Sequence, residues 1–312
     1  MPVITWTKGR LVFETARQRP WMASHGCTPT AIVLADRFRV LFAPRDDRGR
    51  SIPSYVDFAL DEPFRVLEVC EAPLMALGAL GTFDDGGIMP CSVIRADDGR
   101  LMLYYVGWNA SVSVPYRNAI GLAVSVDEGR SFTRLFPGAV VDRSRDEPFF
   151  TASPCAFRRA GRWHLWYAST IRFEMHEGLA EPVYILRHAT SDDGIEWARG
   201  GPPVLPQRHP AEAQARPSVR ALPDGALEMW YCHRDNRNFR DGSGSYRIAR
   251  ALSTGALENW QRTADEAGPP RGAHDSAMQC YPNVVEHGGR LHLFYNGDGF
   301  GRAGILHASR PI

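Results

Sequence analysis

Short apolar segments alternate with glycine- and aspartate-rich turns along the whole chain. The stretch CYPNVVEHGGRLHLFYNG, residues 280–297, contains a proline, a strand pattern, a Gly-Gly turn, a second strand pattern ending in bulky residues, and a glycine. Tight Gly or Asp-Gly turns between two apolar segments are typical of β-hairpins. Helical periodicity is weak throughout, so the pattern predicts an all-β fold.

The same unit occurs five times. Its prolines are Pro29, Pro90, Pro154, Pro217 and Pro282, separated by 61, 64, 63 and 65 residues. The paired bulky residues of the second strand are Leu41-Phe42, Tyr104-Tyr105, Trp166-Tyr167, Trp230-Tyr231 and Phe294-Tyr295. A near-constant period of this length indicates a repeat architecture.

A third strand follows each hairpin, and a fourth often carries an aromatic residue, as at Phe132, Trp197 and Trp260. Five such units predict a five-bladed β-propeller with four-stranded antiparallel blades. We expect one domain, residues 1–312, with blades at approximately 29–80, 90–140, 154–205, 217–265 and 282–309. We expect each proline to begin an innermost strand, where no ladder donor is lost.

The ends of the chain suggest how the ring closes. The last unit has no pattern for a fourth strand, whereas RLVFE, residues 10–14, precedes the first unit. We expect this segment to supply the outer strand of the fifth blade, which would remove an open sheet edge.

Two turns between third and fourth strands share an Asp-Gly signature. They are SVDEGRSF, residues 125–132, and SDDGIEW, residues 191–197. The first resembles the Asp-box of sialidase propellers. We expect a structural role, in which the Asp side chain bonds turn amides and the aromatic residue packs between sheets.

Composition excludes several partners. The net charge is +1, so no global field attracts nucleic acid or a membrane surface. There is no run of 18 apolar residues and no signal-peptide pattern. The six cysteines are Cys27, Cys70, Cys91, Cys155, Cys232 and Cys280, with no Cys-x-x-Cys pair. We therefore expect free thiols in a cytoplasmic protein.

Candidate acids lie in the loops just before the repeat prolines, which should line one mouth of the propeller. They are Asp84 and Asp85, Asp146 and Glu147, Glu212, and Asp275, in four of the five units. Carboxylates that converge on one pocket suit acid-base chemistry. Any single one could instead cap a turn. A metal site or a cysteine nucleophile beside His25 and His274 is a further alternative, although the spacing matches no zinc pattern.

Candidate ligand-binding residues lie mainly where the second strands end. They are Arg45, Asp46, Trp108, Asn109, Arg234, Asn296 and Asp298, joined by His25, Arg216 and Tyr281. Arginine, carboxylate and aromatic groups together suit a polyhydroxylated ligand. The alternative is that the Arg-Asp pairs are salt bridges that fix loops.

The chain resembles the five-bladed propeller glycosidases of the arabinanase and invertase groups, and most of all a bacterial glycosylase-like branch associated with polysaccharide gene clusters. The matching segments include FDDGGIMP (83–90), DEPFF (146–150), HATSDDGIEW (188–197) and DSAMQCYPNV (275–284). The resemblance implies Glu147 as general acid and Asp84 or Asp85 as a second acid. Blade one, with SHGCTP, lacks the family's Asp, so Asp275 or Glu212 would have to replace it.

The sequence and the resemblance together favour a glycoside hydrolase-like enzyme. It would act on a glycosyl or sugar-derived small molecule in a central axial pocket, without a metal cofactor. Two alternatives stay open. One is a phosphorylase, transferase or lyase on the same pocket, with Arg45, Arg216 and Arg234 converging if it binds phosphate. The other is a carbohydrate-binding propeller without catalysis.

Overall fold

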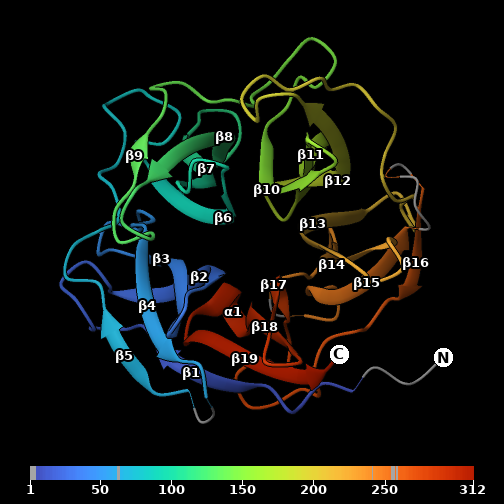
Figure 1. Cartoon of the computed structure of the whole chain (residues 1–312). Coiled ribbons are helices and arrows are strands. Elements are labelled where there is room, and N and C mark those ends of the chain that lie inside the picture. Colours follow the sequence, from blue (N-terminus) through green and yellow to red (C-terminus); the bar gives the residue numbers. More distant parts are fainter. Residues whose placement is uncertain (1–4, 62–63, 241, 254–256, 258) are drawn as a thin grey trace.

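The computed structural model describes residues 5–61, 64–240, 242–253, 257 and 259–312. Its strands form five antiparallel sheets arranged as blades around a common axis (Figure 1). The prediction of an all-β, five-bladed propeller is confirmed. Within the described ranges the one helix is α1 (Asp298–Gly301), a single turn after the second strand of blade five. No helix there is long and apolar enough to cross a membrane.

The strands follow the chain from the axis outward in each blade. Blade one is β2 (Ser24–Val33), β3 (Arg37–Arg45), β4 (Ser54–Ala59) and β5 (Val66–Val69). Blade two is β6 (Gly87–Arg95), β7 (Leu101–Ala110), β8 (Tyr116–Ser125) and β9 (Thr133–Arg134). Blade three is β10 (Thr151–Arg159), β11 (Arg162–His176) and β12 (Leu179–Ser191). Blade four is β13 (Glu212–Ala221), β14 (Leu227–Asp235), β15 (Arg247–Ser253) and β16 (Trp260–Ala264). Blade five is β17 (Cys280–His287), β18 (Arg290–Asn296), β19 (Gly304–Pro311) and β1 (Arg10–Glu14).

The outermost strand is the variable part of the blade. Blade three has three strands, and a single bridge between Thr190 and Ala198 stands where its fourth strand was expected near Trp197. The Asp-Gly turns of blades two and three precede this outermost position. In both turns the Asp side chain bonds turn amides, as expected. Asp127 accepts a hydrogen bond from the Ser131 amide, and Asp193 accepts one from the Ile195 amide.

The N-terminal strand closes the ring. β1 pairs antiparallel with β19, with Arg10 opposite His307 and Glu14 opposite Gly304 (Figure 1). Phe13 is 4% exposed, and its ring meets that of Phe42 in blade one edge to face at 5.5 Å. The predicted closure by residues 10–14 is therefore confirmed.

The repeat prolines lie on the innermost strands, but they do not begin them. Four lie inside a shift of the pairing register with the second strand, and Pro90 stands directly before such a shift. At such a β-bulge one residue leaves the ladder, so a proline there costs no hydrogen bond. The residue before the proline has a positive φ in four blades: Thr28, Ser153, Arg216 and Tyr281, at 52° to 54°.

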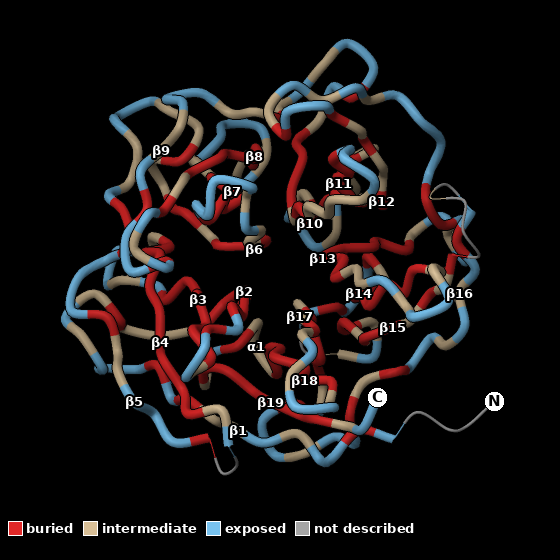
Figure 2. Tube along the Cα trace, viewed as in Figure 1, coloured by how far each residue is buried: buried red, intermediate tan, exposed pale blue. Residues whose placement is uncertain are grey.

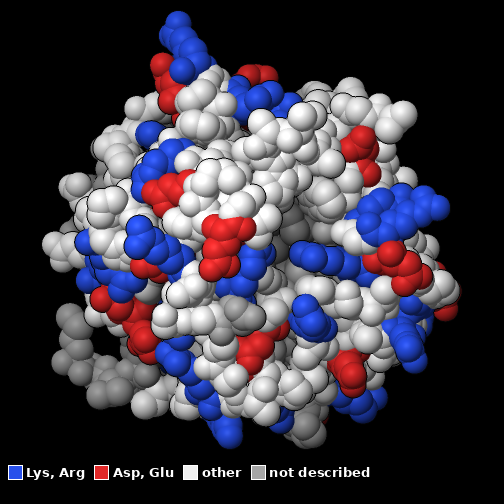
Figure 3. All heavy atoms as spheres, turned by 180° about the vertical axis from the view of Figure 1, so that it is seen from behind, with Lys and Arg blue, Asp and Glu red and all other residues white. Residues whose placement is uncertain are grey.

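The buried residues follow the middles of the strands, and the exposed ones follow the rim and the loops (Figure 2). On the face seen in Figure 3, basic and acidic side chains are interspersed, which fits the net charge of +1. The second strands carry the largest buried side chains, among them Trp166 and Trp230.

A buried pair between an acid and a tyrosine repeats between loops and second strands. The second residue of the bulky pair is a tyrosine in blades two to five. The hydroxyl of Tyr105 donates to Asp84 at 3.0 Å, that of Tyr167 to Glu147 at 2.8 Å, and that of Tyr295 to Asp275 at 2.8 Å. In blade four the acid, Glu212, bonds arginines instead, and the Tyr231 hydroxyl has no hydrogen-bond partner among the described residues.

Blade one supports a structural role for the acid–tyrosine pair. Its second strand has Phe42 at the tyrosine position, and its loop SHGCT has no acid. A phenylalanine cannot donate a hydrogen bond, so the acid and the tyrosine are absent together. The recurrence of acids at one phase of the repeat therefore reflects a packing unit.

Two stacked histidine pairs repeat in blades three and five. His164 Nδ1 lies 3.1 Å from His188 Nε2, with the rings nearly parallel, and His292 Nδ1 lies 3.2 Å from His307 Nε2. Burial, aided by the neighbouring His164, lowers the pKa of His188 to about 4. Burial, aided by His292, also lowers the pKa of His307 well below its ordinary value.

The acid–tyrosine pair can be tested by removing one hydroxyl. Tyr295→Phe leaves the buried Asp275 carboxylate without one of its donors, so we expect the free energy of unfolding to fall by about 1–3 kcal/mol. Tyr231→Phe is the matched control, because its hydroxyl has no partner to lose among the described residues. Equilibrium denaturant unfolding measures both. An equal loss in the two variants would contradict the pair's role.

The histidine pairs predict a loss of stability in mild acid. Unfolded histidine takes up a proton near pH 6.5, whereas folded His188 resists protonation down to about pH 4. The folded state should therefore lose stability as pH falls through this window. Thermal melts between pH 7.5 and 4.5 should show a weaker pH dependence for His188→Gln than for the wild type. The exposed His274→Gln is the control, and an unchanged slope in His188→Gln would refute the assignment.

Candidate functional site

A pocket of about 900 Å³ lies at the axis, where the innermost strands begin. Cys27, Met89, Ala152, Ala215 and Tyr281 line it, one from each innermost strand. The ends of β3, β7 and β14, the starts of β8 and β12, and Tyr246 just before β15 form its walls. The sequence predicted this mouth correctly, as the place where loops before the prolines meet the ends of the second strands.

Backbone strain gathers around this pocket. Five of the residues that line it are not glycine and yet have φ between 52° and 62°: His25, Thr28, Ser153, Tyr281 and Phe300. Each such conformation costs on the order of 1–3 kcal/mol and persists only where the surrounding structure holds it. Strain of this kind concentrates at functional sites, so it marks the pocket independently of its size.

Aromatic rings form much of the wall. Trp108 is held by a hydrogen bond from its Nε1 to the Ser51 hydroxyl at 3.1 Å. Across the pocket the ring of Tyr246 packs against those of Tyr281 at 5.9 Å and Phe300 at 6.3 Å. Sugar faces pack on aromatic rings, and such pockets orient ligands with a few polar groups.

Arg234 is a buried support for this wall. It lies 3.8 Å from the centre of the Phe239 ring and donates to the Pro182 carbonyl at 2.7 Å. It also donates to the hydroxyls of Tyr184 and Tyr246, each at 3.3 Å. Because its donors are already engaged by the protein, Arg234 holds tyrosines in place more than it offers a free charge.

Two carboxylates line the pocket within the described part of the chain, Glu181 and Asp298. Glu181 is 5% exposed and accepts a hydrogen bond from Arg240 at 2.6 Å through Oε1. Asp298 accepts from the amides of residues 276–278 at 2.8 to 3.1 Å and from the Ser276 hydroxyl. Asp298 is thus occupied with holding a loop, and Glu181 is the more available acid.

Glu181 was missed by the sequence reasoning. It lies at the start of the third strand of blade three, directly before Pro182. The residues expected from the sequence lie in the loops before the first strands and at the ends of the second strands. The signal was present in the AEPVY segment, because a third strand that follows a long hairpin also begins at the mouth.

None of the five acids expected to be catalytic lines the central pocket. Asp84 bonds Tyr105 and Arg134, and Asp275 bonds Tyr295 and Gln279. Asp85 accepts the Gly81 amide and closes a turn. The pairing of these side chains with the second strand and with turns directs them away from the axis.

Glu147 and Glu212 are likewise buried among arginines. Glu147 lies 3.7 Å from Arg199 and 3.9 Å from Arg187, next to Tyr167. Burial opposes the charge of Glu212, but the bonds from Arg262 and the Arg208 amide lower the pKa of this carboxyl to about 2. Neither carboxyl lines the central pocket, so neither faces a ligand bound there.

The ten expected ligand-binding residues divide into two groups. Those that line the pocket are His25, Arg45, Trp108, Arg234, Tyr281 and Asp298. The other four bond the protein itself. Asp46 bonds Arg50, Asn109 bonds the Thr82 carbonyl, Asn296 bonds the Thr28 amide, and Arg216 bonds the Pro29 carbonyl.

Arg216 lies across the axis and is 1% exposed. It donates to the carbonyls of Pro29 and Cys91 and to the Thr30 hydroxyl, and so links blade four to blades one and two. No carboxylate pairs with it among the described residues. A buried cation with neutral acceptors only is costly. This one lies next to the pocket, because its acceptor Cys91 lines it.

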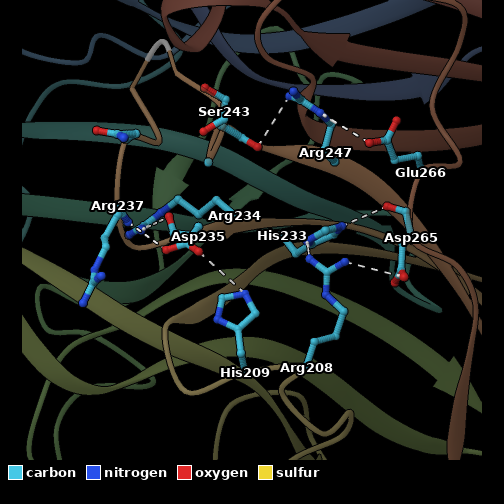
Figure 4. Close-up of a pocket in the computed structure, with 13 residues that line it drawn as sticks. Arg208, His209, His233, Arg234, Asp235, Arg237, Ser243, Arg247, Asp265 and Glu266 are labelled. Carbon is cyan, nitrogen blue, oxygen red and sulfur yellow. Dashed lines mark hydrogen bonds and ion pairs between the residues drawn. The ribbon is translucent and has the colours of Figure 1, made fainter.

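A smaller pocket of about 400 Å³ lies against blade four (Figure 4). Its charged groups face one another: Arg208 lies 3.5 Å from Asp265, His209 3.8 Å from Asp235, and Arg247 3.8 Å from Glu266. In these contacts the charged side chains of the smaller pocket face one another. In the described ranges no group of three or more His, Cys, Asp or Glu side chains could hold a metal ion.

Solved structures share the fold of this chain. A structure described as a glycoside hydrolase has a TM-score of 0.76 at 15% identity, covering 99% of this chain and 93% of the other. A glycosyl hydrolase from Bacteroides ovatus has a TM-score of 0.73 at 15% identity, covering 98% and 95%. A GH130 protein, described with mannoside phosphorylases and hydrolases of β-1,2 mannosidic linkages in Candida mannan, has 0.73 at 14%, covering 98% and 95%. The expected resemblance to five-bladed propeller glycosidases is confirmed for the fold.

Sequence comparison identifies nearer relatives. No family model matches the chain. Two uncharacterised proteins of Mycobacterium tuberculosis, MT1551 of strain CDC 1551 / Oshkosh and Rv1502 of strain ATCC 25618 / H37Rv, are each 32% identical over 306 residues. The alignments cover 97% of this chain and 98% of each relative. The protein therefore belongs to the family of MT1551 and Rv1502.

Proposed function

We propose that this protein is a sugar-active enzyme whose substrate, a glycosyl or sugar-derived small molecule, binds in the central pocket. The observation that carries the proposal is the pocket itself, which combines aromatic walls, arginines and one available buried carboxylate under a strained backbone. The names of the structural neighbours, glycosyl hydrolase and mannoside phosphorylase among them, support the same class.

Glu181 is the residue we propose as general acid. It would give its proton to the leaving oxygen as the bond between that oxygen and the anomeric carbon breaks. Arg240, at 2.6 Å, would stabilise the carboxylate that remains. This role replaces the one that the family resemblance assigned to Glu147, because Glu181 lines the pocket and Glu147 does not.

The attacking group distinguishes hydrolysis from phosphorolysis. Hydrolysis by two carboxylates needs a second acid to activate water or to attack the sugar, and Asp298 is already engaged by amides. In phosphorolysis a phosphate oxygen forms the new bond to the anomeric carbon, and one acid suffices. Arg45 and Arg302, which line the pocket and whose side chains bond no described residue, favour this second candidate. A propeller that only binds carbohydrate is the outcome if no turnover occurs.

We also infer a cytoplasmic location and a substrate from polysaccharide metabolism. All six cysteines are free and buried, which fits a reducing compartment. The polysaccharide context is what the resemblance of the sequence implies.

Glu181→Gln tests the proposed acid. The change keeps the shape of the side chain and removes the proton, so ligand binding should survive while turnover falls by about 10²–10⁴-fold. Turnover is measured on a panel of glycosides, each with and without inorganic phosphate. The loss should shrink for substrates whose leaving group needs no protonation.

Glu147→Gln is the matched control, because Glu147 is a buried glutamate outside the pocket. It should keep most of its turnover once its thermal stability has been checked. If Glu147→Gln abolishes turnover while Glu181→Gln retains it, the assignment suggested by the resemblance is right and ours is wrong.

A further inference from the structure

We propose that Arg45, Arg302 and His25 form an anion subsite in the central pocket, which binds a phosphate or carboxylate group of the ligand. The proposal rests on the proposed function, because it names the chemical class of the molecule that the same pocket takes. The proposal differs from binding of a neutral glycoside alone. Either the ligand has an anionic group, or an anion binds together with it.

Backbone pairing brings the three residues together from separate segments. Arg45, at the end of β3, is the partner of Ser24 on β2, so it lies beside the next residue, His25. The His25 amide in turn donates to the Arg302 carbonyl at 3.4 Å, just after α1. All three line the pocket.

Arg45 and Arg302 differ from Arg234 and Arg240, which also line the pocket. Arg234 is buried and bonds tyrosines and carbonyls, and Arg240 pairs with Glu181. The side chains of Arg45 and Arg302 have no hydrogen bond or ion pair with any described residue, and both are exposed to the pocket mouth. Their donors are therefore available to a ligand.

The charge balance of the pocket also favours an anion. Among the residues that the structure describes, four arginines line it against two carboxylates, Glu181 and Asp298. Arg216 adds a buried positive charge next to the lining residue Cys91, without a carboxylate partner among the described residues. Two guanidinium groups that face the same pocket repel each other, and a bound phosphate or carboxylate relieves this repulsion.

His25 is a neutral neighbour of the two arginines. Burial, together with the nearby charges of Arg45 and Arg302, lowers the pKa of His25 to about 4. The Ser24 hydroxyl engages its Nδ1 at 2.7 Å, and the backbone is held at a φ of 62°. A neutral, fixed imidazole adds a polar contact to an anion without adding to the repulsion between the arginines.

The test is direct binding of inorganic phosphate by calorimetry, at low salt and neutral pH. The wild type should bind phosphate saturably. Arg45→Gln and Arg302→Gln should each weaken the Kd by roughly 10–100-fold, as expected for the loss of hydrogen bonds to a charged group. Arg65→Gln is the control, because Arg65 is exposed on the outer part of blade one and does not line the pocket. Thermal melts check that each variant folds.

A second arm identifies the source of the anion. α-D-mannose 1-phosphate and α-D-glucose 1-phosphate are compared with the corresponding methyl glycosides and with D-glucuronate. Tighter binding of a sugar phosphate or of glucuronate than of phosphate, lost in Arg302→Gln, supports an anion that belongs to the substrate. Simultaneous binding of phosphate and a neutral glycoside supports the same subsite with free phosphate as co-substrate.

The subsite and the proposed function fail in different ways. If the wild type does not bind phosphate or any anionic sugar, or if Arg65→Gln weakens binding as much as Arg302→Gln, the subsite is refuted. Neutral glycosides can still bind and turn over in that case. Phosphate binding that depends on Arg45 and Arg302, with no sugar bound or converted, would confirm the subsite and refute the sugar function.

Discussion

The structure depends on one constraint: five sheets have to meet around an axis and leave no open edge. The pairing of β1 with β19 meets this constraint, because it joins the two ends of the described chain within blade five. Phe13 then packs against Phe42 of the first blade. With the ring closed, the positions of the five innermost strands are fixed relative to one another, and so is the pocket that they surround.

The closed ring explains where strain can be held. Bulges at the repeat prolines turn residues of the innermost strands out of the ladder, and Thr28, Ser153 and Tyr281 take positive φ there. Arg216 does the same and spans the axis to reach carbonyls of two other blades. Each feature is costly alone, but the surrounding blades hold all of them around the pocket.

The charges divide between two tasks. Most acids of the repeat bond tyrosines or arginines between loops and blades, as Asp84 and Asp275 do, so they contribute to stability. The pocket keeps few acids and several arginines. This division is consistent with a ligand that brings negative charge of its own, and it concentrates the proposed proton transfer on Glu181.

The sequence by itself determined the repeat, the five blades, the closure by residues 10–14 and the end of the propeller at which the pocket opens. These follow from periodicity, because a strand pattern repeated every 61 to 65 residues leaves few architectures. The sequence did not determine whether the side chain of each loop acid faces the pocket or the neighbouring strands. Glu147 and Glu181 are both acids before a proline in blade three, yet only Glu181 lines the pocket. That choice was made by tertiary structure, because a carboxylate goes where a buried partner can satisfy it, and the partners come from segments far apart in the chain.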